Sequence, residues 1–267
     1  MLSAPVLVAA FDGWIDAAGV ATACANHVAE GGHVVASFDV DSLNDYRARR
    51  PVLDVVDGVL AKMEWPDILL RHVRVGDRDV LVLVGPEPDY KWKQLGDDVV
   101  DLARRLGVTE WISLGAIPAA VPHTRPVPVL ATASTAASLR DGEQQGPGGI
   151  LRVPAAALSA VEMTVAGAGI PAIGYYAQVP HYIGATAYAP ATLALLQHLE
   201  RRLGVTIPLG TLGDDAVAQR QRLDAAIAED DDSREYLSKL EALASEERMP
   251  TGDELATEIE RYLKEQT

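Results

Sequence analysis

The sequence predicts an α/β protein, a three-layer α/β/α sandwich with a helical extension after it. Short apolar stretches rich in β-branched residues alternate with stretches of helical period between residues 6 and 203. One of them, 79–84, is almost continuously apolar, which is typical of a central strand buried on both faces. From Asp214 onward sixteen Asp and Glu stand against seven Lys and Arg, so this part carries nine of the fifteen net negative charges. We therefore expect a core domain, 1–210, and an acidic helical module, 211–267.

Composition and charge argue against several classes of protein. The net charge of -15 leaves no excess of Lys and Arg to neutralise phosphates, so we expect neither nucleic acid nor an anionic membrane as a partner. The N-terminal apolar run has no basic segment before it, and prolines and glycines divide the uncharged stretch 163–199, so neither a signal peptide nor a membrane span is expected. The single cysteine, Cys24, excludes an internal disulfide and is expected to be a buried thiol. These features predict a cytoplasmic protein.

The first strand and helix set the pattern for the rest of the chain. Residues 6–11 are apolar, too short for a helix, and end at Asp12-Gly13. Asp16 is a natural N-cap for a helix that begins at Ala17, among alanines and valines. A strand that feeds a helix through a short loop is the building unit of an α/β sheet.

The next elements continue this alternation. Residues 33–39 are expected to form the second strand, and a polar loop, 41–51, follows it. Two apolar stretches, 68–75 and 79–84, flank a Gly-Asp turn and predict a hairpin. The helix predicted over 91–106 has leucine and valine at three- and four-residue steps and a glycine directly after it.

The second half of the core domain alternates in the same way. The expected strands are 110–115, 127–133, 150–153 and 171–179, and the expected helices are 155–167 and 191–203. Between them, the polar and glycine-rich stretch 139–149 is predicted to be a mobile loop.

Three helices are expected in the acidic module. Apolar residues at helical spacing predict one helix around 217–227, one around 236–243 and one around 255–263. Thr251 and Glu254 have the spacing of a capping box before the last of these.

Polar and aromatic side chains follow the predicted strands, at the points where the strands end. Because ligands and partners of open α/β sheets meet the carboxyl ends of parallel strands, these side chains are expected to share one edge of the sheet. The candidate binding residues are Asp12, Trp14, Asp16, Asp45, Tyr46, Arg50, Glu87, Asp89, Tyr90, Trp92, His123, Arg125, His181 and Tyr182.

Each of these candidates has a structural alternative. Asp12 and Asp16 suit helix capping, since a cap needs only a short polar side chain. His123 and His181 each follow a proline, and a loop histidine more often bonds to backbone than to a ligand. The two lie far apart in sequence and lack the spacing of a helical metal pair, so no metal is expected. The sequence contains no nucleophile elbow and no phosphate-binding loop, so we expect no cofactor and assign no catalytic residue.

Four motifs together resemble the proteasome assembly chaperone family, and its actinobacterial branch in particular. They are FDGWIDAAGVA at 11–21, GPEPDYKW at 85–92, GAIPAAVPHTRP at 115–126 and PHYIGATAYAPAT at 180–192. The resemblance implies an α/β/α fold similar to that of purine nucleoside phosphorylases and related hydrolases. It also implies a role in assembly of the proteasome core particle. Some members carry a terminal hydrophobic-Tyr-X tail, whereas this sequence ends in Glu265-Gln266-Thr267.

Two functions are therefore considered. The first is a non-enzymatic assembly chaperone or interaction protein, with proteasome subunits as the partners that the resemblance implies. The second is a small-molecule enzyme that binds a nucleoside- or nucleotide-like ligand at the sheet edge, although fold alone does not establish this. Under either function we expect a homo-oligomer. By analogy with phosphorylases of the related fold, we expect it to be a trimer.

Overall fold

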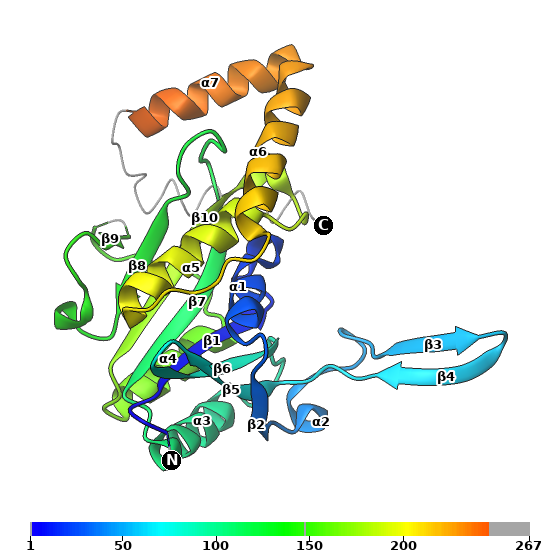
Figure 1. Cartoon of the computed structure of the whole chain (residues 1–267), viewed down its shortest axis with the longest axis vertical. Coiled ribbons are helices and arrows are strands. Elements are labelled where there is room, and N and C mark those ends of the chain that lie inside the picture. Colours follow the sequence, from blue (N-terminus) through cyan, green and yellow to red (C-terminus); the bar gives the residue numbers. More distant parts are fainter. Residues whose placement is uncertain (1, 147, 246–267) are drawn as a thin grey trace.

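The structure, a computed structural model, describes residues 2–146 and 148–245 and contains an eight-stranded mixed sheet with helices on both faces (Figure 1). In spatial order the strands are β2 (His33–Ser37), β5 (Leu69–Val75), β6 (Arg78–Pro86), β1 (Val6–Asp12), β7 (Glu110–Ala119), β10 (Ala172–Pro180), β8 (Val129–Ala133) and β9 (Gln144–Gln145). The helices are α1 (Val20–Val28), α2 (Val40–Leu43), α3 (Trp92–Leu106), α4 (Ala157–Gly167), α5 (Ala189–Leu203), α6 (Leu212–Ala228) and α7 (Asp231–Ser245). The α/β class and the C-terminal helices predicted from the sequence are confirmed.

Strand β1 shows how the apolar sequence builds two separate cores. Its side chains alternate between the faces of the sheet, as the period of a strand requires. Val6, Val8 and Ala10 pack with α1 and α5 on one face. Leu7, Ala9 and Phe11 pack with α3 and α4 on the other. This strand is therefore apolar throughout because it is buried on both faces, as the three-layer prediction requires.

The four central strands are parallel and the outer strands are mixed. β6, β1, β7 and β10 run in the same direction, whereas β5 and β8 run against their neighbours β6 and β10. The loops that follow the four central strands therefore emerge at one edge of the sheet, in the order β6, β1, β7, β10.

The sequence prediction was wrong in two places along the first half of the chain. The first helix does not begin at Ala17: Ala18 and Gly19 have positive φ angles of 56° and 64°, which confine residues 17–19 to one 3₁₀ turn before α1. The expected polar loop 41–51 begins inside the short helix α2, and a second sheet that was not predicted follows it. This is the antiparallel hairpin of β3 (Val52–Val56) and β4 (Val59–Glu64), which projects from the body in Figure 1.

The predicted strand 150–153 is also absent. These residues belong to no helix or strand, and residues 148–155 are all exposed. The prediction followed their apolar, β-branched composition, but no strand of the described structure pairs with them. Composition favours a strand only where a neighbouring strand supplies the hydrogen bonds.

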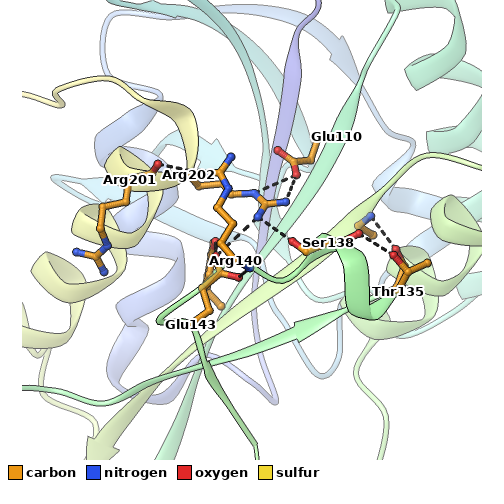
Figure 2. Close-up of polar contacts among 10 residues, drawn as sticks. Glu110, Thr135, Ser138, Arg140, Glu143, Arg201 and Arg202 are labelled. Carbon is orange, nitrogen blue, oxygen red and sulfur yellow. Dashed lines mark hydrogen bonds and ion pairs between the residues drawn. The ribbon is translucent and has the colours of Figure 1, made fainter.

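A buried arginine holds the segment that precedes residues 148–155. This segment includes part of the predicted mobile loop, 139–149. Arg202 of α5 is 8% exposed; its Nε lies 3.0 Å from Oε1 of Glu110, and its Nη1 donates to the carbonyl of Ser138 at 2.9 Å (Figure 2). Arg140 donates to the carbonyl of Arg201 at 2.9 Å. Glu143 accepts a hydrogen bond from Tyr175 of β10. This part of the loop is therefore held against α5 and the sheet.

The C-terminal helices continue from the body. Helix α6 packs against α5, and α7 packs against α6. Leu212 and Leu223 of α6 contact the core on the α1 and α5 side of the sheet. The expected helix around 255–263, with Thr251 and Glu254, lies outside the described residues. Within 2–146 and 148–245, no helix is both long and apolar enough to cross a bilayer.

Candidate functional site

The candidate residues lie in two groups along the edge where the parallel strands end. The loops after β6 and β1, together with residues 41–50, form the acidic loop cluster, which contains Asp12, Asp45, Glu87, Asp89 and Tyr90. The loops after β7 and β10 form the helix-covered cluster, which contains His123, Arg125, His181 and Tyr182.

Glu87 connects three segments of the acidic loop cluster. One carboxylate oxygen accepts a hydrogen bond from the backbone N–H of Trp14 at 2.8 Å, and the other accepts from the N–H of Ala157 at 2.7 Å. This arrangement needs a glycine at position 13, because a Cβ there would lie 2.6 Å from the Cβ of Glu87. Glu87 thus positions the loop after β1 against the start of α4.

Further acidic side chains of this cluster hold the segment 41–50 against the sheet edge. Arg49 donates to the Asp12 carboxylate at 2.6 Å and to its carbonyl at 2.9 Å. The carboxylate of Asp89 accepts from the N–H of Asp45 at 2.7 Å, and Tyr90 donates to the Asp45 carboxylate at 3.3 Å. The charge of Asp45 raises the pKa of Tyr90. The cluster is thus a set of loop-to-loop hydrogen bonds.

Four aromatic or basic candidates lie around this cluster. Tyr46 donates to Asp41, which raises the pKa of Tyr46 to about 12, and its ring meets that of Trp65 edge-on at 5.1 Å. The indole N–H of Trp92 donates to the carbonyl of Pro88 at 2.6 Å. Arg50 is exposed on the segment that leads into β3, and Trp14 is 40% exposed.

Asp16 is buried and does not belong to the acidic loop cluster. Only 7% of it is exposed, and its Oδ1 accepts a hydrogen bond from the N–H of Ala21 at 2.6 Å, in the first turn of α1. It therefore caps α1 across the 3₁₀ turn, which is the structural alternative considered from the sequence. Burial raises the pKa of Asp16, and the hydrogen bonds from Thr22 and Ala21 partly offset that rise.

His123 is enclosed between the sheet edge and helix α6. Its side chain is fully buried; Nδ1 lies 2.8 Å from the hydroxyl of Tyr182, and Nε2 lies 3.1 Å from the carboxylate of Asp224. The N–H of His123 also donates to the Tyr182 hydroxyl at 2.8 Å. Burial raises the pKa of Tyr182 to about 12. Both ring nitrogens of His123 are thus occupied by groups of the same chain.

His181 and Arg125 are joined to α7 in the same way. The Nδ1 of His181 lies 3.2 Å from the carbonyl of Ala119, and its Nε2 lies 3.1 Å from the hydroxyl of Tyr236. Arg125 donates to the hydroxyl of Ser245 at 3.1 Å. The neighbouring Thr124 donates to Glu241 at 2.5 Å. Helices α6 and α7 therefore cover this part of the sheet edge within the same chain.

The covering helices leave a hollow between them. A mainly apolar cavity of about 480 Å³ opens between α6, α7 and the loop after β10. Its lining residues are Tyr182, Leu223, Ala226, Ile227, Asp232, Ser233, Tyr236 and Leu237. Most of these residues come from the C-terminal module, so the cavity exists only when that module is docked.

The candidate side chains of both clusters are bonded mainly to one another and to the backbone. Both ring nitrogens of His123 and of His181 have partners, and the carboxylates of Asp12, Glu87 and Asp89 accept hydrogen bonds from Arg49 or from backbone N–H groups. Within 2–146 and 148–245, no three His, Cys, Asp or Glu side chains gather as a metal ion would require. Cys24 is buried in α1, and burial raises the pKa of its thiol, which disfavours the reactive thiolate.

Sequence reasoning did not single out the partners that complete these clusters. Arg49 was present in the polar loop but was not among the candidates. Asp224, Tyr236 and Glu241 were read only as parts of acidic helices. The signal for the last three was weak, because a polar side chain on a helix looks the same in the sequence whether or not a side chain of a distant loop contacts it.

The fold and this edge together define a class of protein: an α/β/α sandwich whose parallel-strand loops are partly covered by C-terminal helices. The model of the PAC2 family matches residues 10–227, and the chain belongs to that family. This confirms the resemblance to proteasome assembly chaperones seen in the sequence. No curated protein matches the chain.

Several solved structures are similar to this chain. A proteasome-assembly chaperone homologue from Mycobacterium tuberculosis is 36% identical, with a TM-score of 0.80 over 87% of this chain and 99% of the other. A Corynebacterium glutamicum protein of unknown function is 33% identical, with a TM-score of 0.86 over 91% of each chain. Pyrococcus furiosus PbaB, described as an archaeal proteasome activator, is 15% identical, with a TM-score of 0.63 over 84% of this chain and 94% of that one, and shows the fold alone.

Proposed function

We propose that this protein is a non-enzymatic assembly chaperone that binds unassembled subunits of the proteasome core particle in the cytoplasm. Membership of the PAC2 family and the similarity to a proteasome-assembly chaperone homologue support this proposal. The observation that carries it is the covered sheet edge: the histidines there are bonded on both ring nitrogens, and an apolar cavity lies between α6 and α7 instead. An apolar hollow rimmed by polar groups is suited to an inserted side chain of a protein partner.

The direct test is reconstitution with purified components. Separately purified core-particle α and β subunits from Mycobacterium tuberculosis are mixed with and without this protein, and assembly is followed by native mass spectrometry. We expect the protein to co-elute with unassembled subunits, to speed formation of the core particle, and to be absent from the finished particle. No complex with either subunit type, together with an unchanged assembly rate, would overturn the proposal.

The cavity itself can be tested with a matched pair of variants. Ala226 lines the cavity and is exposed, so Ala226→Glu puts a charge in it without disturbing the core. Ala218 is exposed on the same helix and does not line the cavity, so Ala218→Glu adds the same charge elsewhere. We expect Ala226→Glu to weaken subunit binding by at least tenfold, about 1.4 kcal/mol, and Ala218→Glu to leave it unchanged. Equal binding by both variants would exclude the cavity as the docking site.

The alternative, a nucleoside- or nucleotide-binding enzyme, predicts a different result. It requires ligand-binding groups at the sheet edge that are free to contact a substrate. A ligand that binds the folded state raises the unfolding temperature. A thermal shift with nucleosides, phosphate or ATP would favour this alternative, and its absence at millimolar concentrations would favour the chaperone.

Two further expectations remain part of this proposal. We propose that 1–210 form a core domain and that 211–267 form a separate module that covers it. The contacts of His123, Arg125 and His181 with α6 and α7 connect the domain to the module. We also propose that the protein is a homo-oligomer, with three subunits by analogy with phosphorylases.

A further inference from the structure

The two tyrosines that line the cavity between α6 and α7, Tyr182 and Tyr236, donate their hydroxyl protons to histidines. Nε2 of His123 lies 3.1 Å from the carboxylate of Asp224, which can only accept, so Nδ1 is the nitrogen that accepts from Tyr182 at 2.8 Å. Nδ1 of His181 lies 3.2 Å from a backbone carbonyl, so its Nε2 accepts from Tyr236 at 3.1 Å. Both protons are therefore used by residues that do not line the cavity.

The other two polar side chains of the lining, Asp232 and Ser233, are acceptors as well. The Ser233 hydroxyl donates to the carboxylate of Asp230, which also accepts from the N–H of Ser233 at 2.9 Å. Asp232 is exposed, and its carboxylate forms no hydrogen bond or ion pair with the residues that the structure describes. The lining side chains therefore offer oxygen acceptors to a ligand and no donor.

The charge around the cavity has the same preference. None of the eight lining residues is Lys, Arg or His. The chain turns from α6 into α7 beside the cavity (Figure 1), and residues 229–234 contain four acidic residues and one basic residue, Arg234, which is paired with Asp231. These carboxylates outweigh the positive charge of roughly half a unit at a helix N-terminus. The surroundings therefore attract a cation.

The cavity has an apolar wall and an acidic wall. Leu223, Ala226 and Ile227 line it from α6, and Asp232 lines it from the first turn of α7. A ligand that fills this space needs an apolar part for the first wall and a hydrogen-bond donor for the second.

We infer that the cavity receives a lysine side chain of the protein partner. The lysine ammonium has three donors and no acceptor, which complements a lining of acceptors. Its unbranched stem packs along apolar surface while the charged head stays near water. A carboxylate or phosphate group would instead meet Asp232 and find no side-chain donor. A glutamate at position 226 would replace part of the wall that contacts the stem, so Ala226→Glu should still weaken binding.

The source of the lysine rests on the proposed function, whereas the preference for a cation rests on the cavity alone. The first test therefore contains no proteasome subunit. The full-length protein, labelled at leucine and isoleucine methyl groups, is titrated with hexylammonium, hexanol and hexanoate, which share one alkyl chain and differ in charge. The methyl signals of Leu223, Ile227 and Leu237 are followed by NMR.

We expect hexylammonium to shift these methyl signals and to bind at least about tenfold more tightly than hexanol. Hexanoate should cause no shift. Equal binding of the three compounds, tighter binding of hexanoate, or no shift with hexylammonium would overturn the inference.

A matched pair of variants locates the group that selects the cation. Asp232→Asn and Asp231→Asn each remove one negative charge from the first turn of α7, but Asp231 does not line the cavity. We expect Asp232→Asn to abolish the preference for hexylammonium over hexanol and Asp231→Asn to retain it. Hexanol binding by both variants shows that the cavity is still formed. An equal loss of preference in both variants would overturn the role of Asp232.

The second test concerns the residue of the partner. Core-particle subunits are compared after acetylation of their lysines, which removes the charge, and after reductive methylation, which keeps it. We expect acetylation to weaken binding by at least about tenfold and to have little effect on binding by Asp232→Asn, and we expect methylated subunits to bind. Binding that survives acetylation, or that is lost after both modifications, would overturn the lysine assignment. If unmodified subunits did not bind, the chaperone proposal would fail, and the hexylammonium titration would still decide the preference of the cavity.

Discussion

At the scale of single residues, polar side chains in this protein act mainly as connectors between segments that are distant in sequence. Glu87 is the clearest case, since one carboxylate bonds to the backbone of both Trp14 and Ala157. The sequence presented Glu87 as a candidate binding group in a proline-rich loop. Its structural role depends on Gly13, whose missing side chain makes room for it. Proximity of this kind is not encoded in local sequence pattern.

We predict that Gly13→Ala displaces Glu87 and destabilises the fold. The added Cβ would lie 2.3 Å from a carboxylate oxygen and 2.6 Å from the Cβ of Glu87, so the side chain must move and release two backbone N–H groups. We expect a loss of about 1–3 kcal/mol in the free energy of unfolding, measured by urea denaturation. Gly167→Ala, at a glycine with open space around it, is the control and should change stability little. Equal stability of both variants would contradict this role of Gly13.

A buried carboxyl gives the second prediction at this scale. Burial raises the pKa of Glu162, and the hydrogen bond from Ser113 at 2.5 Å only partly offsets it. The folded state therefore holds this proton more tightly than the unfolded chain does. The contribution of the protonated Glu162 to the free energy of unfolding is complete below the pKa that Glu162 has in the unfolded chain. It is lost as pH rises through the higher pKa of the folded state.

We expect Glu162→Gln, which keeps a hydrogen-bond acceptor for Ser113, to remove this part of the pH dependence. Urea denaturation between about pH 4 and about pH 8 should show the wild type losing stability relative to the variant as pH increases. Glu229→Gln, at an exposed residue, serves as the control and should follow the wild-type profile. A constant difference between Glu162→Gln and the wild type would mean that Glu162 does not titrate differently on folding.

At the scale of elements, the regular strands and helices could be predicted and the irregular connections could not. The alternation in β1 and the leucine spacing of α3 are local, so both elements appear close to their expected bounds. The hairpin β3–β4 was missed although Asp57-Gly58 is a strong turn signal, and both residues have the positive φ angles of a type I′ hairpin turn. The stretch 150–153 was predicted as a strand on composition alone, and composition does not report whether a pairing strand is present.

Arg202 gives a prediction at the element scale, because it joins α5 to the segment before β9. Replacing it with Met leaves Glu110 and Glu143, which are mostly buried, without their cation. We expect Arg202→Met to lower the free energy of unfolding by about 3–5 kcal/mol and to open the 139–145 segment to limited proteolysis. Arg201→Met is the control. Arg201 is exposed and accepts the hydrogen bond from Arg140 through its backbone carbonyl, so this substitution should change stability and proteolysis little. Proteolysis at equal rates in the two variants would argue against this anchoring.

At the scale of the whole molecule, the C-terminal helices determine what the sheet edge presents. Without α6 and α7 the side chain of His123 would lose its cover at the end of β7, and Arg125 and His181 would lose their contacts with α7. A truncated chain, 1–210, tests whether the proposed core domain is independent. We expect it to unfold cooperatively on heating, at a lower temperature than the full chain, since α6 also covers apolar surface of α5. Loss of cooperative unfolding would place the domain boundary elsewhere.

The sequence by itself determined the α/β class, the order of the main strands and helices, the acidic C-terminal helices and the family resemblance. These rest on periodicity, composition and short motifs, which are local properties of the chain. Only the tertiary structure decided that Asp16 caps a helix, that the loop histidines are bonded to α6 and α7, and that, within 2–146 and 148–245, the hairpin β3–β4 and residues 150–153 do not join the main sheet. Those outcomes depend on which distant segments come into contact. Burial and hydrogen bonding select these contacts only once the sheet has formed.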